Sequence, residues 1–197
     1  EIKNPLTSLR SAVETMGYAR TPDQRQQLLD VIQQDVGRLD RLVTDIANAS
    51  RLDAELVRER MEPFDLCRLC RGIAGMFADR AAGRGVHVEL SLPGEPLTAH
   101  GLEGRIAQVI TNFLDNALSF SPEGSTVRLA AGRTAGGVRV GVADEGPGVP
   151  EENLEAVFSR FYTERPEEQG FGNHSGLGLA ISRQIVEAHG GHIWVEN

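Results

Sequence analysis

Two amide side chains four residues apart, Asn112 and Asn116, are the first residues in this chain that could do chemistry. Residues 102–120 have apolar positions at helical spacing, so the two amides share one face of a predicted helix. Amide oxygens on a core-packed helix suit a hard cation such as Mg²⁺, which keeps phosphate oxygens and water as its other ligands. A polar stripe facing solvent explains the pair equally well.

A second cluster, Asp144-Glu-Gly-Pro-Gly148, follows a run with strand-like alternation. A buried carboxylate at a strand end can accept a hydrogen bond from an exocyclic amine. Gly146 and Gly148 have no Cβ and would let the backbone approach a flat ring closely. Taken alone, this cluster favours the alternative of a tight turn after the strand.

The third cluster, Gly176-Leu177-Gly178-Leu179, opens the last helix-like run. Free backbone N–H groups at a helix start favour phosphate, and Ser175 could add a hydroxyl donor. A glycine-capped junction between loop and helix is the alternative. The three clusters together indicate a site for ATP and Mg²⁺. Without such a site, the separate alternative explanation of each cluster would have to be true at the same time.

Residues 145–175 lie between the second and third clusters and are rich in Gly, Pro and Glu with little periodicity. Such a stretch within a compact domain is usually a lid or a functional loop. Phe158 could anchor this lid to the core, and Arg160 could face a phosphate. An ordinary surface turn is the alternative.

The elements that must position these clusters lie in residues 63–197, a predicted catalytic ATP-binding domain. The pattern predicts an α+β sandwich, a mixed sheet with helices on one face. Expected helices are 66–82, 102–120 and 177–189. Expected strands are 86–90, 97–101, 126–131, 138–142 and 192–196, with a hairpin across Gly136-Gly137.

Residues 1–60 have almost no strand signal and predict an all-α helical hairpin. Thr21 is a candidate N-cap, and Pro22 suits the first position of a second helix that runs to about Arg60, before Pro63. From Leu29 to Ile46 its apolar residues repeat with the spacing of a coiled-coil seam. A helix of roughly 55 Å cannot bury that seam within one hairpin. We therefore expect a homodimer through residues 1–60 that forms a four-helix bundle. Packing of the hairpin on its own second domain is the alternative.

Composition argues against nucleic-acid binding, a membrane span and a zinc site. The net charge of −8 argues against nucleic-acid binding, and no apolar run approaches the roughly 20 residues that span a bilayer. We therefore expect no membrane contact by this fragment. Cys67 and Cys70 could bind zinc or cycle between redox states, but no second pair or nearby His completes a zinc set. We expect two reduced, partly buried thiols on a helix.

In this order the motifs resemble the kinase core of a bacterial sensor histidine kinase of two-component systems, over nearly all of the chain. Glu1-Ile-Lys-Asn-Pro-Leu-Thr7 matches the residues that follow the phosphorylated histidine of the H box. Residues 112–117 match the N box, 144–148 the first glycine box, 158–162 the F box and 175–179 the second glycine box. Residues 38–53 and 116–121 are also similar to the ChvG/ExoS-type kinases of alphaproteobacteria.

The resemblance implies a Bergerat-type ATP-binding fold with assigned site residues. Asp144 would hold the adenine amine, Asn116 the Mg²⁺, and Asn112 the metal or the phosphates. The second glycine box would shape the phosphate end, and Phe120 would pack near the base.

The resemblance also implies two chemical steps. ATP would phosphorylate a histidine immediately before Glu1, and the phosphoryl group would then pass to an aspartate of a response regulator. Glu1 would act as general base, and Asn4 would orient water for dephosphorylation of the regulator. The chain would be the cytoplasmic portion of a bacterial sensor anchored in the inner membrane.

Departures from the family pattern leave two rival functions open. Ser119 stands where many relatives have Lys or Arg, and Thr163 stands where some have a second Arg in the lid, although Arg165 could compensate. An ATPase of the gyrase and Hsp90 kind shares this fold but places a Glu where Asn112 stands. A dimeric scaffold that binds nucleotide without kinase activity is the other rival.

Overall fold

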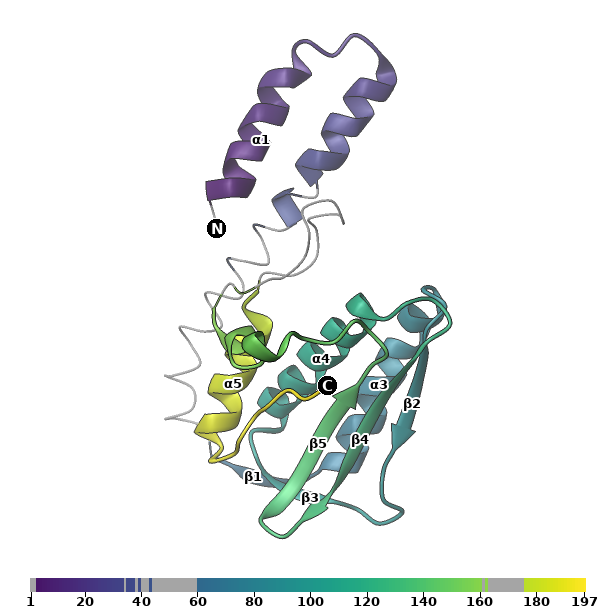
Figure 1. Cartoon of the computed structure of the whole chain (residues 1–197), viewed down its shortest axis with the longest axis vertical. Helices are drawn as coiled ribbons and strands as arrows, with labels where there is room; N and C mark the ends of the chain where they lie inside the picture. Colours follow the sequence, from purple (N-terminus) through teal and green to yellow (C-terminus); the bar gives the residue numbers. More distant parts are fainter. Residues whose placement is uncertain are drawn as a thin grey trace.

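The chain begins with a helical hairpin and continues into helices packed on one face of a β-sheet, as Figure 1 shows. This computed structural model describes residues 3–33, 35–37, 39, 43, 60–160, 162 and 176–197. Within those ranges, no helix combines the length and the apolar character that crossing a membrane requires.

The hairpin consists of α1 (Lys3–Met16) and a second helix described from residue 22. A reciprocal cap fixes the second start: Gln24 N donates to Thr21 Oγ1 (3.2 Å), and Thr21 N donates to Gln24 Oε1 (3.3 Å). This capping box satisfies two backbone N–H groups at once. The predicted N-cap at Thr21 and helix start at Pro22 are therefore confirmed. Residues 44–59 lie outside the described ranges, so the length of this helix and the boundary near residue 60 stay predictions.

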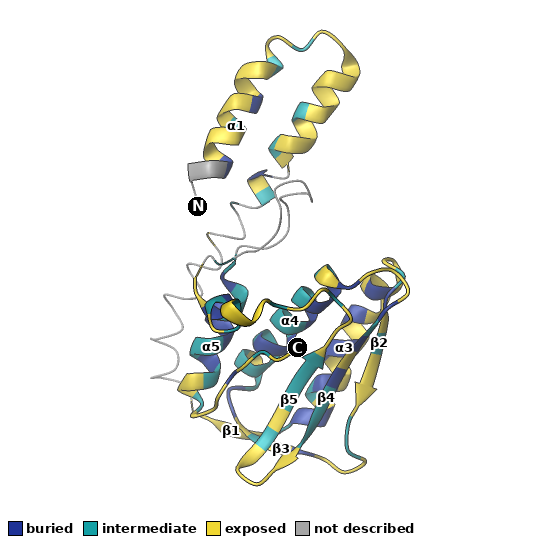
Figure 2. Cartoon of the chain, in the orientation of Figure 1, coloured by how far each residue is buried: buried dark blue, intermediate teal, exposed yellow. Residues whose placement is uncertain are grey.

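Apolar side chains remain uncovered along the hairpin, which is largely exposed in Figure 2. α1 exposes Leu6 (50%) and Val13 (59%), and the second helix exposes Leu29 (43%) and Val36 (52%). Leu29 and Val36 belong to the predicted seam, where apolar side chains normally face further helices. A single hairpin thus leaves part of the seam in water.

The rest of the described chain is an α+β sandwich. Its helices are α3 (Leu66–Ala82), α4 (Glu103–Phe120) and α5 (Gly178–Ala188). One sheet pairs β1 (Glu62–Asp65) with β3 (Thr98–Gly101); the other has the order β2 (His87–Ser91), β4 (Thr126–Thr134), β5 (Gly137–Ala143). β2 runs parallel to β4, and β5 runs antiparallel to it. The predicted mixed sheet with helices on one face is confirmed.

Two clusters of apolar side chains hold these layers together. The larger joins α3, α4 and the sheet, and includes Phe77, Leu114 and Leu129. The smaller joins α4 to α5, and Leu39 of the second hairpin helix packs against it. This Leu39 contact favours some packing of the hairpin on its own second domain.

One expected strand is absent, and two local details differ from expectation. The strand β1, which includes Pro63 opposite His100 of β3, was not expected; a strand with one partner tolerates a residue that lacks an N–H. The expected hairpin between β4 and β5 is confirmed, but its turn consists of residues 135 and 136, and Gly137 is already paired with Thr134. Residues 192–196 form no strand. Their alternation reflects the burial of Ile193 in a cluster with Val157 and Phe158, without a ladder of strand hydrogen bonds.

Cys67 and Cys70 are free, fully buried thiols on α3, so the predicted reduced pair is confirmed, and its burial is complete. Asp65 Oδ1 caps this helix by accepting from Cys67 N (2.9 Å). Burial, and then the neighbouring Cys67, raise the pKa of the Cys70 thiol from 9.0 to about 11.

We expect the Cys70 thiol to be alkylated only slowly in the folded protein. We also expect its titration to lower the free energy of unfolding in alkaline solution. Its raised pKa leaves about 100-fold less thiolate at pH 8 than in the unfolded chain, so alkylation should be slower by at least that factor. Between pH 9 and about 11 the unfolded chain binds fewer protons than the folded one, so this contribution to stability is full below pH 9 and is lost above it. Alkylation in buffer and in urea tests the first point, and urea titrations at pH 8 and 10.5 test the second. Cys70→Ala is the control, since it should lose this pH dependence. Equal alkylation rates in both solvents would contradict the expectation.

Candidate nucleotide-binding site

A hydrogen-bond network joins the first and third sequence clusters. Asn112 Nδ2, in the middle of α4, donates to Gly178 O (3.0 Å) and to Ser182 Oγ (3.1 Å) on α5. A Cβ added at Gly178 would lie 3.5 Å from the Asn112 amide carbon. The amide nitrogen of Asn112 is therefore committed to α5, and its oxygen, which bonds to none of the described residues, is the group left for a ligand.

Asn116 lies one turn further along α4 and is half-buried. No hydrogen bond joins its side chain to any residue that the structure describes. The Asn116 amide is therefore available to a ligand or to water.

The second cluster meets the C-terminal end of α4. Asp144 Oδ1 accepts from Gly146 N (2.8 Å), which fixes the turn after β5. A Cβ at Gly146 would lie 2.7 Å from Asp144 Oδ1 and 3.2 Å from Phe120 Cβ, so a side chain there would displace Asp144 or Phe120. Phe120 is 45% exposed. Asp144 is exposed as well, and the expectation of a buried carboxylate was wrong because the loop lies on the surface of the sandwich.

The F-box region is anchored in the core. Phe158 lies in the short helix η2 (Ala156–Phe158) and is buried with Val157 and Ile193; Leu179 packs against this cluster from α5. The anchoring role predicted for Phe158 is consistent with this packing, while Arg160 is exposed. In the second glycine box, Gly176 adopts a left-handed φ of +67°, and Leu177 is buried where α5 begins.

Two family models match the chain. The model described as the His Kinase A (phospho-acceptor) domain matches residues 1–55. The model described as histidine kinase-, DNA gyrase B- and HSP90-like ATPase matches residues 101–197. The ATPase model alone would also fit gyrase-like ATPases. The phospho-acceptor model, which matches the hairpin, distinguishes a histidine kinase from those ATPases. This chain belongs to the histidine kinase family.

Individual relatives agree with that family. This histidine kinase chain is 47% identical over its whole length to the sensor protein ChvG of Rhizobium meliloti, and 35% identical over 98% of its length to the signal transduction histidine-protein kinase BaeS of Escherichia coli. The expected similarity to ChvG-type kinases is thereby confirmed. The chain spans 35% and 41% of the lengths of these two relatives.

Solved histidine kinases share the fold. Full-length ShkA in complex with AMPPNP is 31% identical with a TM-score of 0.71, covering 98% of this chain and 40% of that one. ThkA in complex with the response regulator protein TrrA is 27% identical with a TM-score of 0.78, covering all of this chain and 55% of that one.

Some predicted residues of this histidine kinase fall in parts of the chain that the structure does not describe. Glu1 and Ser175 lie outside the described residues, as do Thr163, Arg165 and the side chain of Asn4. Their roles stay predictions.

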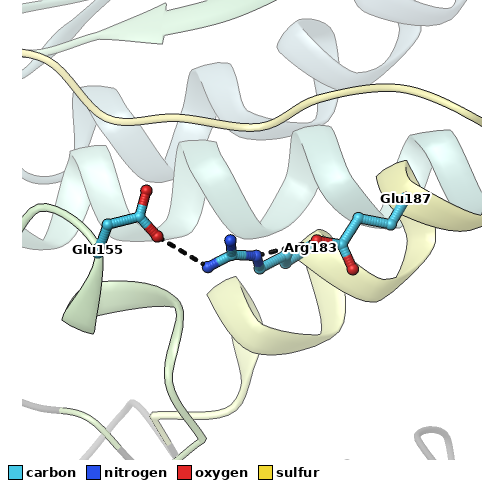
Figure 3. A network of polar contacts seen from close by, with 3 residues as sticks. All are labelled: Glu155, Arg183 and Glu187. Atoms are coloured by element: carbon cyan, nitrogen blue, oxygen red, sulfur yellow. Dashed lines mark hydrogen bonds and ion pairs between the residues drawn. The ribbon is translucent and has the colours of Figure 1, made fainter.

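Arg183 was not singled out in the sequence, yet it holds the F-box region against α5. Figure 3 shows its guanidinium between two carboxylates: Nε lies 3.0 Å from Glu187 and Nη1 3.1 Å from Glu155. Glu187 and then Glu155 raise the pKa of Arg183, and the same group lies 5.5 Å from the centre of the Phe158 ring. Arg183 and Glu187 are four residues apart, a spacing that allows an ion pair within one helix. Glu155 lies 28 residues away in the sequence and comes next to Arg183 only in the folded chain.

His189 fixes the relative position of the two site helices. Its Nε2 accepts from Leu102 N (3.0 Å) just before α4, and its Nδ1 donates to Ile185 O (2.7 Å) within α5. A Cβ at Gly101 would lie 2.6 Å from the imidazole. His189 therefore has a structural role, and together with Asn112 it ties α4 to α5 at two points.

Proposed function

We propose that this chain is the kinase core of a protein-histidine kinase. It uses ATP to phosphorylate a histidine immediately before Glu1, and it passes the phosphoryl group to an aspartate of a response regulator. The contact between Asn112 and Gly178 carries this proposal, because it brings a metal-binding type of amide against the glycine cluster suited to phosphate.

The nucleotide would lie along α4. Asn116 and the free oxygen of Asn112 suit Mg²⁺, which would neutralise phosphate charge when bound. Beyond Asn116, Phe120 would pack near the adenine and Asp144 would accept from its exocyclic amine. The close approach at Gly146 supports this arrangement.

Further residues are candidates for contacting the base and the phosphates of the nucleotide. Gly148 would complete the base-side turn, and residues 176–179, with Ser175, would surround the phosphates. Arg160, on the lid anchored by Phe158, would contact a phosphate oxygen.

The transfer itself needs little from the protein beyond positioning. The bond between the β,γ-bridging oxygen and the γ-phosphorus breaks, a bond from that phosphorus to an imidazole nitrogen forms, and ADP leaves. Glu1 takes the imidazole proton as general base. In the second step the phosphorus–nitrogen bond breaks as a carboxylate oxygen of the regulator attacks. Asn4 would orient a water that later hydrolyses the phosphoaspartate, giving phosphatase activity.

Asn112 favours transfer over hydrolysis. An amide cannot accept a proton, so it cannot supply the general base that the gyrase-like rival places at this position. The relatives support both partners of the reaction: ShkA was solved with AMPPNP and ThkA with a response regulator.

We expect the protein, extended by one helical turn before Glu1, to incorporate label from γ-labelled ATP. The label should be acid-labile and stable in base, as a phosphoramidate is. A variant with that preceding histidine changed to Gln is the matched control and should stay unlabelled. Phosphate release without label would favour the ATPase, and nucleotide binding with neither would favour the scaffold.

A homodimer through residues 1–60 is part of this proposal. The exposed Leu29 and Val36 of the seam support it, since a second hairpin would cover them. Sedimentation equilibrium should give about twice the chain mass of 21.4 kDa. A monomer at micromolar concentration would contradict it.

We also propose that the chain is the cytoplasmic portion of a bacterial sensor anchored in the inner membrane. The relatives named sensor proteins support this placement. Recovery of the complete protein in the soluble fraction of lysed cells would contradict it.

A further inference from the structure

The last residue of the chain contacts the glycine loop at 144–149. Asn197 Oδ1 accepts from Val149 N (2.9 Å), and Asn197 Nδ2 donates to Val149 O (2.7 Å). One side-chain amide therefore occupies both backbone polar groups of Val149, as a neighbouring strand would. Nothing in the sequence pattern suggested this pairing, which spans 48 residues.

Gly148 is fitted to the same amide. It adopts a left-handed φ of +74°, and a Cβ there would lie 2.8 Å from Asn197 Oδ1. A side chain at position 148 would thus be strained and would also displace the amide. The loop and Asn197 are complementary in shape as well as in hydrogen bonding.

The segment that presents Asn197 is itself held in place. Ile193 is buried with Phe158, and Glu196 pairs with Arg139 of β5 (3.0 Å). The Arg139 guanidinium also lies 4.7 Å from the centre of the Trp194 ring. Figure 1 shows this segment running beside β5 toward the end of the strand.

We propose that Asn197 is a positioning residue for purine-nucleotide binding, an inference that rests on the proposed function. The loop is fixed at one end by the bond between Asp144 and Gly146, and at the other by Asn197. Those two anchors hold the Asp144 carboxylate and the Gly146 backbone beside Phe120 in place before a base binds. Because the loop is already ordered, nucleotide binding has a smaller entropic cost.

The test is ADP binding by calorimetry on the complete protein. Asn197→Ala should weaken ADP binding about tenfold, because two hydrogen bonds no longer order the loop. Glu196→Gln is the matched control: it weakens the adjacent contact with Arg139 but leaves the loop bonds, and it should bind ADP within twofold of the unaltered protein. The melting temperature without nucleotide should be similar for the two variants. Lower stability with unchanged ADP affinity would make Asn197 merely structural and would overturn the proposal.

A double mutant gives a second measurement that does not depend on Asn197→Ala alone. Gly148→Ala should weaken ADP binding severalfold more in the unaltered protein than in the Asn197→Ala background, because the collision at 2.8 Å is then gone. Additive losses would overturn the proposal. An unaltered protein that fails to bind ADP would instead refute the proposed function, so the two failures are distinguishable.

Discussion

Replacing Asp144 by Asn is expected to weaken ATP binding about 100-fold. One carboxylate oxygen already accepts from Gly146 N (2.8 Å), and the other is left for the exocyclic amine of adenine. In the amide, one of these two positions becomes an NH₂ group that must face another donor. A charge-assisted hydrogen bond is then lost and an unsatisfied donor is left behind.

Calorimetry with ATP and with inosine triphosphate, whose base lacks the amine, measures this effect. The variant should lose affinity for ATP and change little toward inosine triphosphate. Glu145→Gln removes a neighbouring exposed carboxylate and serves as the control for charge. Equal losses for both nucleotides would mean that Asp144 does not read the amine.

Replacing Asn116 by Ala is expected to reduce Mg²⁺-dependent labelling of the extended protein at least about 100-fold, since it removes a direct metal ligand. The variant should remain as stable as the unaltered protein, because its amide has no hydrogen-bond partner among the described residues. Asn112→Ala should differ: it also breaks the bonds to Gly178 and Ser182, and should cost about 1–3 kcal/mol of stability.

Labelling at a series of Mg²⁺ concentrations, together with thermal melts, separates these effects. Asn116→Asp is the matched control, since it keeps an oxygen ligand at the same place and should retain much of the activity. Full labelling of Asn116→Ala at low Mg²⁺ would remove this residue from the metal site.

Local features of the fold were predictable from the sequence. The expected bounds of α3 match the structure, α4 begins one residue later than expected, and α5 is one residue shorter than expected at each end. Helical periodicity and capping depend on residues three or four apart, as at Thr21 and Gln24. β1 was missed because its pairing with β3 depends on residues far along the chain, and its proline pointed to a helix end.

The candidate site divides in the same way. Its proposed chemistry was visible in Asn112, Asn116 and Asp144, because residue type and order predicted an ATP site and indicated the histidine kinase family. The residues that fix its geometry were not visible. Ser182, Arg183, His189 and Asn197 act across gaps of 28 to 87 residues.

The sequence by itself therefore determined the class of protein and most of its helices and strands, and it predicted the groups that would contact a nucleotide. Only the tertiary structure decided which groups are free to do so. It commits the Asn112 nitrogen to α5, leaves Asn116 without a described partner, and places Asn197 against Val149. The physical reason is that propensity and periodicity are local, whereas a hydrogen bond between distant residues depends on how packed layers bring them together.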